Sequence, residues 1–186
     1  MNQPINISRA VLGIALGTVS ILLVPFLAMQ FTDQVAWKVG DFLIMGVLIF
    51  GTGISFVLVT RVASHFLYWL AFGLALGTTF LLVWANLAVG LIGSGPNLGN
   101  LMYIGVIAIA IIGTISSRFA AMGMERTMYY TALSLVLLAV IALIAKMDAY
   151  SGSSLVDILG INGFFAALYM ISAVLFRKAR HKTAVG

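Results

Sequence analysis

Few side chains in this sequence could do chemistry, and most of those that could stand near the ends of long apolar runs. Six residues are candidates for a ligand site or the lining of a pore: Asn86, Asn162, Trp84, Asp41, Asn100 and Asp157. Carboxylates and amides gathered at one membrane surface could bind a cation, take up protons or hold the polar end of a solute. These positions therefore indicate binding or conduction as the chemistry to consider.

Asn86 and Asn162 are the strongest candidates, because each is predicted inside an apolar run. Asn86 is expected about two turns inside the outer end of its helix, with Asn162 at a similar depth. An amide surrounded by hydrocarbon needs a hydrogen-bond partner, since an unpaired polar group there costs several kcal/mol. The alternative role for both is an interhelical hydrogen bond worth on the order of 1 kcal/mol, with no ligand involved.

Asp41, Asn100 and Asp157 stand at the expected outer ends of the second, fourth and sixth apolar runs. Carboxylates there could bind cations, but Asp and Asn are also the preferred caps of helix N-termini. They complement the positive end of the helix dipole as well. Capping is the favoured interpretation of these three residues. Trp84 fits an interfacial aromatic belt better than an aromatic cage for a ligand.

The motifs of enzymes are missing from the sequence. It has no cysteine, no phosphate-binding glycine loop, no His-Glu-x-x-His and no Gly-x-Ser-x-Gly. Neither His65 nor His181 has a carboxylate at a sequence spacing typical of metal ligands. No ionisable residue falls near the middle of an apolar run, where coupled transporters usually keep one. We therefore predict no catalytic residue, no metal and no cofactor, and we expect that the protein is not an enzyme.

The composition places these residues in a membrane. Of 186 residues, 62% are hydrophobic and 8% are charged, whereas a soluble domain carries about a quarter charged residues. The net charge of +5 does not indicate nucleic-acid binding, because the basic residues are not spread over one folded face. Four of them follow the last apolar run, as expected for an anchor near anionic lipid: Arg177, Lys178, Arg180 and Lys182.

Six apolar runs are long enough to cross the hydrocarbon core, which takes about 20 residues. They are expected at 10–31, 39–60, 66–92, 100–117, 127–146 and 155–176. The predicted fold is all-α: one domain over 1–186, a compact bundle of six transmembrane helices, with a basic cytoplasmic tail at 177–186. The cluster of turn-forming residues at 93–100 separates the third run from the fourth.

Lysine and arginine set the expected orientation. With the N-terminus inside, eight of these residues fall in inner segments and only Lys38 and Lys146 fall outside. Cytoplasmic segments carry the excess of basic residues. Both termini are therefore predicted to be cytoplasmic, in a multi-pass protein of the cell membrane, which we take to be a bacterial inner membrane.

Parts of the sequence repeat with a shift of 60 positions. The motif Gly-x-Ala-Leu-Gly-Thr occurs at 13–18 and again at 73–78. Asp41, Asn100 and Asp157 are each followed five or six residues later by a glycine. The pattern predicts three tandem helical hairpins of about 60 residues. The alternative is the convergent composition of apolar spans.

Two pairs of glycines, Gly13 with Gly17 and Gly73 with Gly77, are each spaced one turn apart on one helix face. Close backbone approach at such pairs drives helix association in lipid. The pairs could form a dimerisation surface. Because they occupy corresponding positions of the repeat, packing of the first helix on the third within one chain is favoured.

Three functions remain open on this sequence. The favoured one is a non-enzymatic scaffold or accessory subunit, whose partners are membrane lipid and another membrane protein or a second copy, with no role for nucleic acid. The first alternative is a channel or transporter for a small neutral or lipophilic solute, with Asn86 and Asn162 at its outer mouth. Threonines could line its path: Thr18, Thr52, Thr78 and Thr114. The second alternative, an intramembrane enzyme acting on lipid, lacks a visible nucleophile–base or metal pair.

Overall fold

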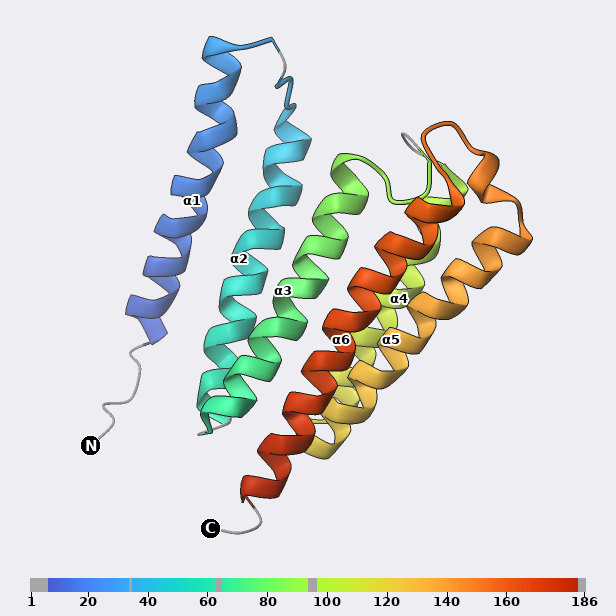
Figure 1. The fold of residues 1–186 in the computed structure, drawn as a ribbon. Coiled ribbons are helices and arrows are strands. Elements are labelled where there is room, and N and C mark those ends of the chain that lie inside the picture. The colour runs from blue at the N-terminus through green and yellow to red at the C-terminus, as the bar shows by residue number, and fades with distance from the viewer. Residues whose placement is uncertain (1–6, 34, 63–64, 94–96, 184–186) are drawn as a thin grey trace. The chain divides into compact units, whose positions relative to one another are not determined.

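A computed structural model describes residues 7–33, 35–62, 65–93 and 97–183. Within these ranges the chain is all-helical, with no strand, and Figure 1 shows the order of the helices. Their bounds are α1 (Ile7–Phe31), α2 (Val39–Val62), α3 (Phe66–Ala88), α4 (Leu98–Ser116), α5 (Ala121–Ile144), the 3₁₀ turn η1 (Met147–Ala149) and α6 (Leu155–Thr183). Six of the described helices are long and apolar enough to cross a membrane. The prediction of an all-α, multi-pass membrane protein is confirmed.

Three helix bounds differ by four residues or more from those expected from the sequence. The helix α3 ends at Ala88 rather than at 92, and Gly90 then takes a left-handed φ of 77°, a conformation that ends a helix. The helix α5 begins at Ala121, and α6 continues to Thr183 through the basic segment. Apolar runs mark only the part of a helix inside the hydrocarbon, so polar turns beyond it were missed.

The chain divides into two compact units, Met1–Arg61 and Val62–Gly186, where the sequence predicted one domain. We call the first the hairpin unit, which holds α1 and nearly all of α2. The second, with α3 to α6, is the four-helix unit. The two units differ in how their helices are held, so each is described by itself.

In the hairpin unit, large side chains of α1 lie over small positions of α2. The Cγ2 atom of Ile14 is 2.7 Å from the point that a Cβ on Gly53 would occupy. Three pairs face each other in antiparallel order: Ile14 with Gly53, Leu22 with Gly46, and Phe26 with Phe42. Four hydroxyls of the two helices instead bond to carbonyls of their own helix: those of Thr18, Ser20, Thr52 and Thr60.

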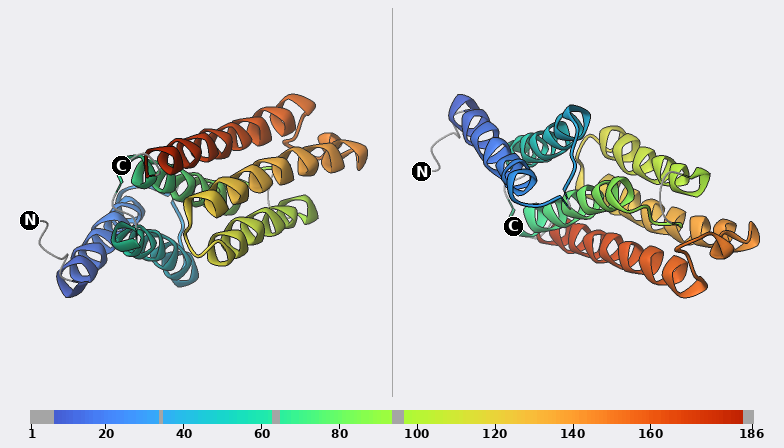
Figure 2. Two further views of the ribbon diagram at one scale, coloured as in Figure 1. Left: turned by 90° about the horizontal axis from the view of Figure 1, so that it is seen from below. Right: turned by 90° about the horizontal axis from the view of Figure 1, so that it is seen from above.

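In the four-helix unit, packing runs in the order α4, α5, α6, α3, and α3 has little contact with α4. The helices α5 and α6 lie side by side in every view (Figures 1 and 2). Buried alanines on α3, α5 and α6 permit close approach of the backbones. They include Ala71, Ala75, Ala132, Ala139, Ala142 and Ala173. The ring of contacts is thus left open between α3 and α4.

Side-chain hydrogen bonds also join the helices of the four-helix unit, and α6 takes part in three of them. The Tyr103 hydroxyl donates to Asn162 Oδ1 over 3.3 Å, which joins α4 to α6. Thr79 and Tyr169 share a bond of 2.8 Å between α3 and α6. Ser172 donates to the carbonyl of Ala71 over 2.8 Å. In hydrocarbon such bonds tie helices together because the polar groups have few other partners.

Three of the four glycines named in these pairs from the sequence make no close contact inside their units. A Cβ added at Gly13, Gly17 or Gly77 would meet no described atom within 4 Å. A Cβ at Gly113 of α4 would lie 2.5 Å from Thr127 Cγ2 of α5. Packing of the first helix on the third through these glycines, dimerisation through them, and the threefold repeat all stay predictions.

Candidate functional site

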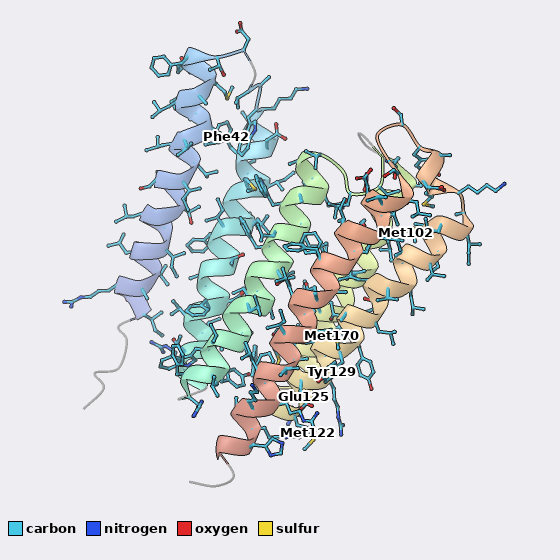
Figure 3. The ribbon with its side chains drawn as sticks, viewed as in Figure 1. Phe42, Met102, Met122, Glu125, Tyr129 and Met170 are labelled. Atoms are coloured by element: carbon cyan, nitrogen blue, oxygen red, sulfur yellow. The ribbon has the colours of Figure 1, made fainter. Side chains whose placement is uncertain are left out.

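A groove of about 910 Å³ lies where α3 ends and α4 begins, within the four-helix unit. It exists because α3 leans on α6 and α4 on α5, so the two helices share little contact. Figure 3 places Met102, next to the groove on α4, and Glu125 of α5 at opposite ends of this unit. The lining residues are Val83, Asn86, Leu87, Ala88, Val89, Gly90, Asn97, Leu98, Asn100, Leu101, Ile104 and Ile107.

The walls of the groove are aliphatic faces of the two helices. On α4 the lining positions Leu101, Ile104 and Ile107 recur every three residues, which places them on neighbouring turns of one face. Leu87 on α3 and both Leu101 and Ile104 on α4 are more than half exposed. The groove is therefore open on the outside of its unit rather than enclosed in the core.

Asn86 is the polar residue of the α3 wall, and only one end of its amide is bonded. Its Nδ2 atom donates to the backbone carbonyl of Asn100 over 3.0 Å, which joins α3 to α4. Its Oδ1 atom is buried and has no hydrogen-bond partner among the described residues. Because α3 ends at Ala88, Asn86 lies in the last turn and not about two turns inside, as the sequence suggested.

Asn100 holds the loop between α3 and α4 against the start of α4. Its Oδ1 atom accepts hydrogen bonds from the backbone amides of Leu91, over 2.8 Å, and Ile92, over 2.9 Å. Gly90 and Gly93 take left-handed φ angles of 77° and 67°, which let the loop turn inward. Asn100 is therefore a buried clamp for the loop, a role that the sequence analysis did not predict.

The N-cap of α4 is Asn97, not Asn100. Its Oδ1 atom accepts from the Asn100 amide over 3.2 Å, and its Nδ2 atom donates to the Ile92 carbonyl over 2.7 Å. The sequence analysis passed over Asn97, although its place after a Gly-Pro pair and three residues before Asn100 fits the usual spacing of a cap. Both asparagines thus use their side chains to fix the floor of the groove.

The other two predicted caps are shifted in the same way. Asp41 and Asp157 lie in the first turns of α2 and α6. Asp41 accepts from the amide of Lys38 over 2.7 Å. Asp157 accepts from the Ser154 hydroxyl over 2.6 Å, and its backbone amide donates to that oxygen over 3.1 Å, the bond by which a serine caps a helix start. Both carboxylates serve helix starts, and neither lines the groove.

Asn162 and Trp84 also lie apart from the groove lining. Asn162 is only 1% exposed, accepts from Tyr103, and donates to the Ile158 carbonyl over 2.8 Å. This geometry fits the structural alternative for Asn162, and the structure does not bring it together with Asn86 at one mouth. Trp84, on α3 beside the lining residue Val83, is exposed. The hydroxyl of Thr78 donates to the Leu74 carbonyl of its own helix.

The opposite end of the four-helix unit carries an ion pair. Glu125 in the first turns of α5 lies 3.3 Å from Arg180 near the end of α6. Glu125 and Tyr129, one turn apart on α5, are drawn there in Figure 3. Among the described residues no group of three His, Cys, Asp or Glu side chains could hold a metal ion. The groove is thus an uncharged site, separate from this basic end.

Comparison with models of protein families, with curated proteins and with solved structures gives no match for this chain. The function therefore has to be argued from the chemistry of the groove.

Proposed function

We propose that this integral membrane protein binds a small, uncharged, lipophilic molecule in the groove between α3 and α4. One observation carries the proposal: about 910 Å³ of space lined by aliphatic side chains, glycine and three asparagines, with no charged residue. Ligand sites typically enclose about 300–1,000 Å³, with mostly apolar walls and a few placed polar groups. The groove fits that description.

The lining supports an uncharged ligand. A charged group moved into an apolar site loses its hydration and needs an opposite charge beside it. None of the lining residues can supply one, and the ion pair of Glu125 with Arg180 belongs to the other end of the unit. Open aliphatic walls favour a molecule that already partitions into the membrane, such as a lipid or another hydrophobic compound.

The lining also supports binding rather than catalysis. Nucleophilic and acid–base catalysis use Ser, Cys, Thr, Lys, His, Asp, Glu or Tyr side chains. The only polar side chains here are amides, which neither attack a substrate nor exchange protons near neutral pH. This argument favours binding of a neutral or lipophilic solute, which the channel or transporter alternative requires, over the lipid-acting enzyme. The groove also favours solute binding over the scaffold that was preferred from the sequence, because the scaffold proposal named no binding site.

The orientation is part of the proposal. The count of basic residues puts both termini in the cytoplasm, and the loop between α3 and α4 then lies outside. The groove would open at the outer leaflet. Reporter fusions after residues 62 and 92 test this: we expect a cytoplasmic signal from the first and an external signal from the second. The reverse result, or one side for both, contradicts the orientation but leaves the groove intact.

Tryptophan quenching tests the binding proposal. In a variant with Trp37→Phe and Trp69→Phe, Trp84 beside the groove is the only tryptophan left. This protein is placed in phosphatidylcholine vesicles and titrated with dibrominated octadecanol, whose bromines quench indole fluorescence. We expect quenching that saturates, as for a site, rather than quenching that rises in proportion to the probe in the membrane.

A matched pair of substitutions on α4 locates the site. Ile104 lines the groove and is 60% exposed, while Ile112 is 62% exposed and lies two turns beyond it. Ile104→Phe fills the groove and should weaken saturable quenching by about tenfold or more. Ile112→Phe should leave it unchanged. Equal effects of the two changes, or the absence of saturation, would overturn the proposed function.

A further inference from the structure

The chemistry of Asn86 narrows the class of ligand. We propose that the bound molecule is a neutral lipid alcohol, such as a long-chain alcohol or a mono- or diacylglycerol, whose hydroxyl donates a hydrogen bond to Asn86 Oδ1. This inference rests on the proposed function, because it specifies what the same groove recognises. Four features of the groove support it.

The first is the orientation of the Asn86 amide, which its partner fixes. Nδ2 lies 3.0 Å from the backbone oxygen of Asn100. A carbonyl oxygen can only accept, so the NH₂ end of the amide must face it. Turning the amide around would set two oxygens against each other. The Asn86 oxygen is therefore held on the side away from Asn100.

The second is the rigidity of that partner. Asn100 is buried in the first turn of α4, and its own side chain accepts the amides of Leu91 and Ile92. The Asn100 amide is bonded to Asn97 as well. These three hydrogen bonds hold Asn100 in place, and its carbonyl therefore stays in position to accept from Asn86. The acceptor is thus preorganised, which lowers the entropic cost of binding a donor.

The third is that Asn86 Oδ1 accepts no hydrogen bond from a described residue. It is buried, with no partner among the described residues, and an unsatisfied buried acceptor costs about 1–3 kcal/mol. The side chains of Asn97 and Asn100 are used in the loop and the cap, so they do not compete for the ligand. A ligand hydroxyl that reaches Asn86 Oδ1 would satisfy this oxygen.

The fourth is the chemistry that the groove excludes. An ether, ester or quinone has only acceptor oxygens and would set oxygen against the oxygen of Asn86. A carboxylate or phosphate adds a negative charge to that conflict. An ammonium can donate, but no lining carboxylate balances its charge. A neutral hydroxyl on a hydrocarbon chain meets both demands of the site: an apolar body and one donor.

The experiment compares two probes that differ in one hydrogen-bond donor. The variant that keeps only Trp84 is titrated in phosphatidylcholine vesicles with dibrominated octadecanol and, separately, with its methyl ether. We expect the alcohol to bind about tenfold more tightly, the effect of one buried hydrogen bond. In the same protein with Asn86→Leu, the preference should fall to near one. The comparison in the protein that retains Asn86 stands by itself if Asn86→Leu does not fold.

The possible outcomes separate this inference from the proposed function. Saturable quenching by both probes with equal affinity keeps the groove as a binding site but overturns the hydroxyl assignment. A preference for the alcohol that survives Asn86→Leu also overturns it, since Asn86 would not be the acceptor. If neither probe gives saturable quenching, the proposed function fails, and the inference fails with it.

Discussion

The hairpin unit and the four-helix unit are both built from helices apolar enough to cross a membrane, but these helices are held in different ways. In the hairpin unit the described contacts between α1 and α2 are apolar, such as Ile14 over Gly53, and hydroxyls bond within their own helix. In the four-helix unit, polar side chains bond from one helix to another, and three of these bonds involve α6. Hydrophobicity carries a helix into the membrane, whereas small residues and polar side chains decide which helices stay together.

The groove follows from the same difference. The pairs α4–α5, α5–α6 and α3–α6 pack closely, whereas α3 and α4 are joined by the bond from Asn86 to the Asn100 carbonyl at one end. That bond takes only the nitrogen end of the Asn86 amide. The site thus lies at the least closed helix pair of the better packed unit. The comparison can be tested by substitutions that should affect one place and not its counterpart.

The largest effect is expected at the close contact between α4 and α5. A Cβ at Gly113 would lie 2.5 Å from Thr127 Cγ2, so Gly113→Ala should reduce the free energy of unfolding by about 2 kcal/mol. On the same helix a Cβ at Gly105 would meet nothing within 4 Å. Gly105→Ala should be neutral or slightly stabilising. Unfolding by sodium dodecyl sulfate in mixed micelles, followed by circular dichroism, measures both. Equal losses at the two sites would mean that the contact is not tight.

A smaller effect is expected when the bond between α4 and α6 is lost. Tyr103→Phe removes the donor to Asn162 and leaves a buried amide oxygen short of one bond. The free energy of unfolding should fall by about 1 kcal/mol. Tyr130 of α5 is 62% exposed, so Tyr130→Phe should change it little. The same detergent titration measures both variants. If Tyr130→Phe lowers the free energy of unfolding as much as Tyr103→Phe does, the hydrogen bond between α4 and α6 does not stabilise the unit.

The smallest effect compares one substitution in the two units. Ser172 of α6 donates to the Ala71 carbonyl of α3, whereas Ser20 of α1 donates to Leu16 of its own helix. Ser172→Ala should cost about 0.6 kcal/mol, the mean for interhelical bonds in membranes. Ser20→Ala should cost close to nothing. If the two free energies of unfolding change equally, the contrast between the units does not lie in their hydrogen bonds.

The sequence was sufficient to predict the six helices and to select Asn86. Both follow from local rules: about 20 apolar residues make a span, and an amide beside such a run needs a partner. The bounds were less accurate where a helix leaves the hydrocarbon, as α6 does when it continues to Thr183. Beyond that boundary hydropathy no longer distinguishes helix from loop.

The groove itself could not be predicted, because it depends on contacts between distant residues. Nothing local indicates that Asn100 turns its side chain back to Leu91 and Ile92. The caps themselves could have been predicted. Asn97 stands three residues before Asn100 and Ser154 three residues before Asp157, which is the spacing of an N-cap and the amide that it accepts. Nor does the sequence show what a helix glycine faces. A Cβ at Gly77 would meet nothing within 4 Å, whereas one at Gly113 would meet Thr127.

The most direct test of the central claim is an experimental density map of the protein in nanodiscs made from the lipid of its own membrane. We predict elongated density in the groove, running along Leu101 and Ile104, with its polar end beside Asn86. A map in which the α3–α4 groove is closed by the protein's own side chains, or holds no density beyond the protein, would contradict the claim that it binds a lipophilic molecule.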